Sequence, residues 1–73
     1  MKNYHLVPAI DRWKLEREGD GTIKYFDSKD EGVKRCTEYL GDQHGSLKIH
    51  RKDGTIEEER TYPRSADPAA LPG

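Results

Sequence analysis

The sequence is 73 residues long, which restricts it to one small domain with a thin hydrophobic core. Charged residues make up 37% of the chain and hydrophobic residues 32%, a composition poor in apolar side chains but still compatible with folding. The 13 Lys and Arg and 14 Asp and Glu give a formal net charge of -1. The chain therefore lacks the overall positive charge that is typical of duplex-DNA-binding proteins, so any basic surface must be local.

The first part of the chain predicts three short strands. Residues 4–8 (YHLVP) are apolar and partly alternating, and Arg12–Arg17 (RWKLER) alternates strictly between apolar and charged side chains. Gly19–Gly21 (GDG) is typical of a tight hairpin turn, because Gly and Asp tolerate positive φ. Thr22–Phe26 (TIKYF) then predicts a third strand that is rich in β-branched and aromatic residues.

The hydrophobic period then changes to that of a helix, which we expect from about Lys29 to Leu40. Ser28 and Glu31 form the S-x-x-E pattern of a capping box, in which each side chain accepts a hydrogen bond from the other residue's backbone N–H. Gly41 offers a left-handed stop just after the helix. Gly32 is a weak position within it, costing about 1 kcal/mol relative to Ala.

The last part of the chain predicts a second hairpin. Residues 45–50 (GSLKIH) resume alternation, Lys52–Gly54 (KDG) predicts a turn, and Thr55–Tyr62 predicts a final strand. The centre of that strand is almost entirely charged, so it cannot be buried on both faces. We therefore expect it at an edge of the sheet, where charge prevents unwanted pairing with other strands.

Together these elements predict an α+β fold: an antiparallel sheet of four or five strands in β-β-β-α-β-β order, with one helix packed on one face. Short connections favour antiparallel hairpins between neighbouring strands. We expect one domain over residues 1–63 and a disordered C-terminal tail over residues 64–73, which is rich in Pro and small residues. The expected core consists of Leu6, Trp13, Leu15, Ile23, Phe26, Val33, Cys36, Leu40, Leu47 and Ile49.

Cys36 is the sole cysteine, so a disulfide cannot form within the chain. We expect a reduced cytoplasmic protein in which Cys36 is a small core residue. The sequence shows no secretory leader and no apolar run near the roughly 20 residues that a membrane span requires, so we expect no membrane association.

Residues that carry catalysis or hold metals do not form a recognisable pattern. His5, His44 and His50 lack metal-binding spacing, and with Cys36 they are too scattered for a structural zinc site. A phosphate-binding loop is also absent, because Gly19–Gly21 is not followed by a helix and a lysine. We therefore expect a non-enzymatic protein with no cofactor and no metal.

The basic residues favour a binding surface on the sheet face opposite the helix. A sheet with such a face can bind nucleic acid. In the alternative interpretation these cations only solvate the face, paired across strands with Glu16 and Glu57. The candidate nucleic-acid-binding residues are Arg12, Lys14, Lys24, Lys48 and Arg51.

A second hypothesis is a protein-interaction module or homodimer that uses a sheet edge or face. The thin core and the strand edges favour it, because an edge can accept another strand. The charged final strand would then meet the partner, with Glu57, Glu59 and Arg60 as the candidate residues.

Residues 4–62 resemble a small bacterial family of unknown function, whose pattern has the form HVVP…W.V…F.TK.EA…L.VH..DG.I…TY. The D-G-x-I and T-Y parts of the last hairpin are the most distinctive match, while Ser28 and Gly32 depart from the usual Thr and Ala. The resemblance implies a fold and no active site. The shorter stretch 12–41 is similar to the arm DNA-binding domains of phage integrases, which bind DNA with a three-stranded sheet.

Overall fold

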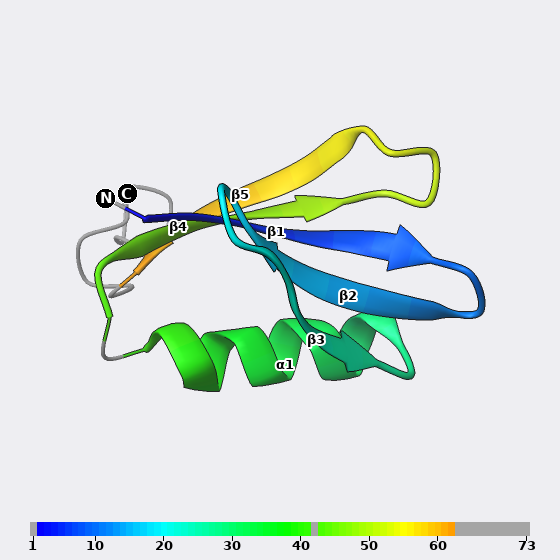
Figure 1. The fold of residues 1–73 in the computed structure, drawn as a ribbon, viewed down its shortest axis with the longest axis horizontal. Coiled ribbons are helices and arrows are strands. Elements are labelled where there is room, and N and C mark those ends of the chain that lie inside the picture. The colour runs from blue at the N-terminus through cyan, green and yellow to red at the C-terminus, as the bar shows by residue number, and fades with distance from the viewer. Residues whose placement is uncertain (1, 42, 63–73) are drawn as a thin grey trace, which may run out of the picture.

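A computed structural model describes residues 2–41 and 43–62, which form one five-stranded sheet with one helix packed on one face (Figure 1). The elements are β1 (Lys2–Ala9), β2 (Arg12–Arg17), β3 (Gly21–Phe26), α1 (Lys29–Leu40), β4 (Gly45–His50) and β5 (Ile56–Tyr62). The α+β class and the element order are as predicted. The expected tail over residues 64–73 lies outside the described residues.

The sheet is mixed, so the prediction of a purely antiparallel sheet was wrong. The strand order is β3-β2-β1-β4-β5, in which β1 pairs antiparallel with β2 and parallel with β4. The reason is the helix between β3 and β4. Because α1 carries the chain back along the sheet, β4 runs in the same direction as β3 and therefore in the same direction as β1. Short connections give antiparallel neighbours only in the β1–β2, β2–β3 and β4–β5 hairpins.

The ends of α1 test two expectations. Ser28 Oγ accepts a hydrogen bond from the Glu31 N–H at 3.1 Å, as the capping box predicts. The Glu31 carboxylate accepts from the N–H of Asp27 at 3.4 Å instead of returning to Ser28. At the other end, Gly41 has φ -55° and ψ -36°, a right-handed conformation, so the predicted left-handed stop was wrong.

The core lies between α1 and the inner face of the sheet. Eight of the ten expected core residues are buried in it, and Val33 is partly buried and packs against it. Ile23 is 41% exposed, because a bulge between Leu15 and Glu16 shifts the β2–β3 register beside it. Tyr4 and Tyr62, each 1% exposed, also take part in the core, although neither is among the ten expected core residues.

Gly32 lies at a point where the helix is close to the sheet. A Cβ at this position would lie 3.0 and 3.2 Å from the two Cδ atoms of Leu6 and 3.3 Å from Phe26. Leu6 is fully buried on the central strand, so it has little room to move away. Gly32 has a low helix propensity, but a side chain at this position would push the helix away from the sheet.

We expect Gly32→Ala to destabilise the protein although Ala is the better helix former. The gain in helix propensity of about 1 kcal/mol is opposed by overpacking, which costs about 1–3 kcal/mol. Urea denaturation should show a lower free energy of unfolding. As a control, Leu6→Val removes both contacting Cδ atoms, so in that background Gly32→Ala should cost less. The same loss in both backgrounds would contradict this explanation.

Candidate functional site: the open face of the sheet

The face of the sheet opposite α1 is lined by two rows of side chains that cross the strands. The strand pairings align Glu16, His5, Lys48 and Glu59 in one row, and Tyr25, Lys14 and Val7 in the other. All of these side chains have the parity opposite to the buried Tyr4, Leu6, Leu15 and Leu47. We call this surface the open face.

Three of the five predicted basic residues reach the open face: Arg12, Lys14 and Lys48. Lys24 does not, so its predicted face was wrong. Phe26 is buried under α1, and Lys24, two residues earlier, points to the same side of the sheet. Tyr25 takes the place on the open face that was expected for Lys24. Arg51 lies in the β4–β5 loop, where its guanidinium donates to the Thr55 hydroxyl and the Ile56 carbonyl oxygen.

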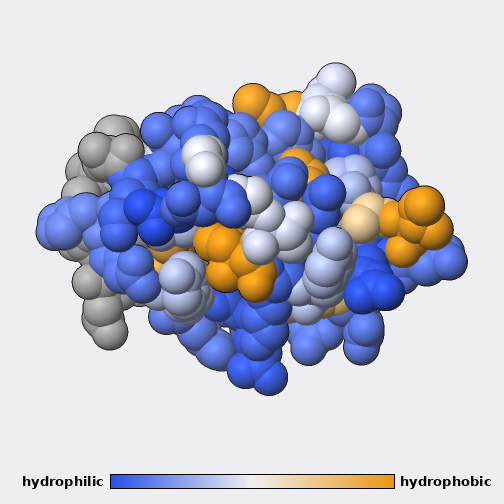
Figure 2. Space-filling model, in the orientation of Figure 1, coloured by the Kyte–Doolittle hydropathy of each residue, from blue (hydrophilic) through white to orange (hydrophobic). Residues whose placement is uncertain are grey.

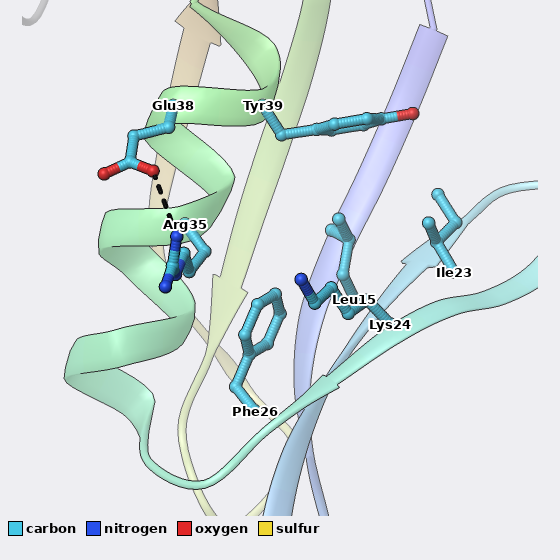
Figure 3. Close-up of a pocket in the computed structure, with 7 residues that line it drawn as sticks. All are labelled: Leu15, Ile23, Lys24, Phe26, Arg35, Glu38 and Tyr39. Atoms are coloured by element: carbon cyan, nitrogen blue, oxygen red, sulfur yellow. Dashed lines mark ion pairs between the residues drawn. The ribbon is translucent and has the colours of Figure 1, made fainter.

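Lys24 lines a groove between α1 and the edge strand β3 (Figure 3). The floor of this groove is apolar, and Figure 3 shows Lys24 extending toward the helix beside Phe26, with its Nζ 6.0 Å from the ring centroid. Arg35 and Glu38 form an ion pair of 3.6 Å on the helix side. The groove has a volume of about 480 Å³ and is lined by Leu15, Ile23, Lys24, Phe26, Arg35, Glu38 and Tyr39.

Most charges on the open face are matched within the chain. Lys14 lies 3.7 Å from Glu16. Lys48 lies 3.7 Å from Glu59 and donates to the side chains of Asn3 and Ser46 at 3.3 and 3.4 Å. Arg12 differs, since its guanidinium carbon lies 4.7 Å from the centre of the Tyr25 ring in a cation–π contact.

The charged strand β5 is at an edge of the sheet, as predicted, and the three residues assigned to a partner have neighbours in the same chain. Lys29 Nζ donates to the Glu57 carboxylate at 2.6 Å and lowers the pKa of Glu57. The Glu59 carboxylate accepts from Ser46 at 3.2 Å. Arg60 Nε donates to Glu58 at 2.6 Å. The contacts from Lys29 and Ser46 therefore attach β5 to the rest of the fold, whereas the Arg60–Glu58 pair lies within the strand.

Two histidines meet on the open face, a contact that the sequence analysis missed. Nδ1 of His5 and Nε2 of His50 are 2.9 Å apart. The other nitrogen of His5 donates to the Glu18 carboxylate at 2.9 Å, and this bond lowers the pKa of Glu18. Nδ1 of His50 donates to the Gly54 carbonyl oxygen at 2.8 Å. The available signal was that the HVVP and VH..DG parts of the quoted pattern each contain one of these histidines.

Within residues 2–41 and 43–62, His, Cys, Asp and Glu side chains do not converge in any group of three or more that could hold a metal ion. His44, the third histidine, lies exposed in the loop before β4. In the same part of the chain α1 is the sole helix, and it is too short and too polar to cross a membrane.

Cys36 lies on the buried face of α1 and is fully covered. Burial raises the pKa of its thiol to about 12 because the thiolate would lose its hydration. The thiolate is the reactive form of cysteine, so Cys36 is a packing residue and not a nucleophile.

We expect Cys36 to be unreactive in the folded protein. A thiol reagent such as Ellman's reagent, applied at about pH 8, should label an ordinary exposed cysteine quickly. Here labelling should require unfolding, so its rate should rise in urea in parallel with the loss of the circular dichroism signal. Rapid stoichiometric labelling of the native protein would contradict the buried position.

The fold and its two faces define a small α+β domain with one covered and one open sheet face. A family model matches residues 4–62, and its description is an uncharacterized protein conserved in bacteria (DUF2188). The chain belongs to this family, as the sequence resemblance implied. A search of the curated proteins gives no match. A search of the solved structures gives none either.

Proposed function

We propose that this chain is a small non-enzymatic module that binds single-stranded nucleic acid at one corner of the open face. The corner consists of Arg12, Lys14 and Tyr25 and is called the basic corner below. The observation that carries the proposal is the cation–π contact, which holds an Arg guanidinium beside a half-exposed aromatic ring. All three residues belong to the stretch 12–41 that resembles the arm DNA-binding domains.

The basic corner supplies both kinds of contact that a single strand needs. Tyr25 is 49% exposed and can stack on a base, while Arg12 and Lys14 lie beside it to neutralise phosphates. The surface around the ring is hollowed and lined by Ala9, Ile10 and the three corner residues. Stacking depends on an aromatic face rather than on net charge, which suits a chain with a formal charge of -1.

The remaining charges on the open face favour a single strand over a duplex. Glu16 and Glu59 balance Lys14 and Lys48, so the long-range attraction to a duplex backbone is small. Lys24 lies on the other face, and Arg51 is bound to its own loop. The footprint is therefore about two phosphates, contacted by Arg12 and Lys14 rather than by all five of the predicted basic residues.

Binding of a fluorescent oligothymidine at low salt should be weak and only moderately salt-dependent. Two phosphate contacts on a single strand predict a slope of log K against log salt of about -1.4. Anisotropy titrations at several salt concentrations measure this slope directly. A slope near zero would show that binding involves no phosphate contacts. A slope several times steeper would show that the basic surface is larger than this corner.

Variants separate the basic corner from the rest of the surface. Tyr25→Ala should lower the affinity by about 5- to 150-fold, because base stacking contributes about 1–3 kcal/mol. Tyr25→Phe should retain most of it. Lys24→Gln is the matched control, since it removes one charge from the neighbouring position on the opposite face. If Lys24→Gln weakens binding as much as Lys14→Gln, the basic corner is not the site.

Exposed apolar side chains favour a homodimer as the second candidate function. Ile10 is 89% exposed, and Tyr25 and Ile56 are each 49% exposed. Tyr25 and Ile56 lie on the two edge strands, and Ile56 is paired with His50. The side seen in Figure 2 is otherwise mostly hydrophilic, with hydrophobic side chains in separate small patches. A second copy of the chain is the partner that this alternative requires.

Sedimentation over a range of protein concentrations tests the alternative. A homodimer held by apolar contacts should increase with concentration and change little with salt. Ile56→Glu should then shift the equilibrium toward the monomer, whereas Lys34→Gln, at an exposed position of α1, should not. A monomer at all concentrations would eliminate this candidate and leave the nucleic-acid proposal unaffected.

A further inference from the structure

His5 and His50 stand on neighbouring strands of the open face, and their second nitrogens have fixed hydrogen-bond partners. The Glu18 carboxylate and the Gly54 carbonyl oxygen can only accept hydrogen bonds, so the nitrogens facing them must carry hydrogens. These are Nε2 of His5 and Nδ1 of His50. The tautomer of each neutral ring is therefore determined by its outer contact.

The inner nitrogens follow from this assignment. A neutral imidazole has one N–H, so Nδ1 of His5 and Nε2 of His50 each present a lone pair. They face each other at 2.9 Å, with ring centres 5.1 Å apart. Two lone pairs at this distance repel unless a positive species lies between them. Either one proton or one metal ion satisfies both nitrogens.

We propose that His5 and His50 form a two-histidine binding site for a divalent late transition-metal ion such as Zn²⁺. Imidazole nitrogen is a preferred ligand for these ions. The outer contacts are also those of metal-binding histidines, which usually donate their second N–H to a carboxylate or a backbone carbonyl. Here Glu18 provides the first kind of acceptor and Gly54 provides the second.

The distance between the inner nitrogens is close to the one that a tetrahedral ion requires. Zinc–nitrogen bonds are about 2.0–2.1 Å, so two nitrogens on a tetrahedral ion lie about 3.3 Å apart. The inner nitrogens would need to separate by about 0.4 Å from their 2.9 Å contact, and each ring would need to tilt, because the ion lies off the line that joins the two nitrogens. The His5 side chain is 23% exposed, so the remaining coordination positions of the ion can be filled from solvent.

Both outer acceptors are held by backbone hydrogen bonds, so they can keep the rings oriented. The N–H of Glu18 donates to the Asn3 carbonyl oxygen at 2.9 Å at the start of the β2–β3 turn. The N–H of Gly54 donates to the Arg51 carbonyl oxygen at 2.9 Å within the β4–β5 loop. The site goes beyond the proposed nucleic-acid binding and uses none of the residues of the basic corner.

Titration with ZnCl₂ alone, followed by NMR of the imidazole nitrogens and by calorimetry, tests the site. At about pH 7.5 the metal-free spectra should show a hydrogen on Nε2 of His5 and on Nδ1 of His50, the nitrogens that face Glu18 and Gly54. Zinc should shift the two inner nitrogens. His5→Gln and His50→Gln should each weaken binding by at least about tenfold. His44→Gln, the matched control at the third histidine, should leave the affinity unchanged.

Glu18 distinguishes a metal site from a merely structural contact, because its side chain is 55% exposed and its loss should not unfold the protein. Glu18→Ala should weaken zinc binding by about tenfold, and Glu18→Gln, which keeps an acceptor, should restore much of it. A dissociation constant above about 1 mM for the native chain would overturn the proposal. A doubly protonated ring without zinc uptake would also overturn it, because the pair would then share a proton instead of a metal.

Discussion

The parallel pairing of β1 with β4 is the constraint on which the rest of the structure depends. It places Tyr4 and Leu6 beside Leu47 and Ile49, and these four side chains form the centre of the core under α1. It also joins the two hairpin units of the chain into one sheet. Because side chains alternate between faces, the same register that buries these residues brings His5 and His50 together on the open face.

The two faces of the sheet differ in the interactions that stabilise them. On the covered face, the small Gly32 lets the helix approach Leu6, and ion pairs such as Lys29–Glu57 attach the helix to the edge strand β5. On the open face, nearly every charge has a partner of opposite sign, so the surface attracts little at long range. Pairing of opposite charges does not explain two arrangements on this face: the Arg12–Tyr25 contact and the histidine pair.

Local sequence patterns predicted the helix and the strands well. Strand pairing and side-chain contacts between distant parts of the chain could not be predicted from them. Ser28, Glu31 and the apolar stripe determine a helix from Lys29 to Leu40, and the structure has the same bounds. The partner of β1 is more than 40 positions away, and alternation within a strand carries no information about it. The bulge beside Leu15 likewise left Ile23 exposed, and both Lys24 and the histidine pair were misjudged because strand faces and neighbours were uncertain.

The central place of β1 also determines the order in which the fold can be completed as the chain emerges from the ribosome. The β1–β2–β3 meander consists of neighbouring segments and can form early, but the second edge of β1 stays unpaired until α1 and β4 have followed. During that interval an apolar strand edge is available to other chains. Completion of the sheet therefore waits for closure of a long loop, and aggregation competes with this step rather than with formation of the hairpins.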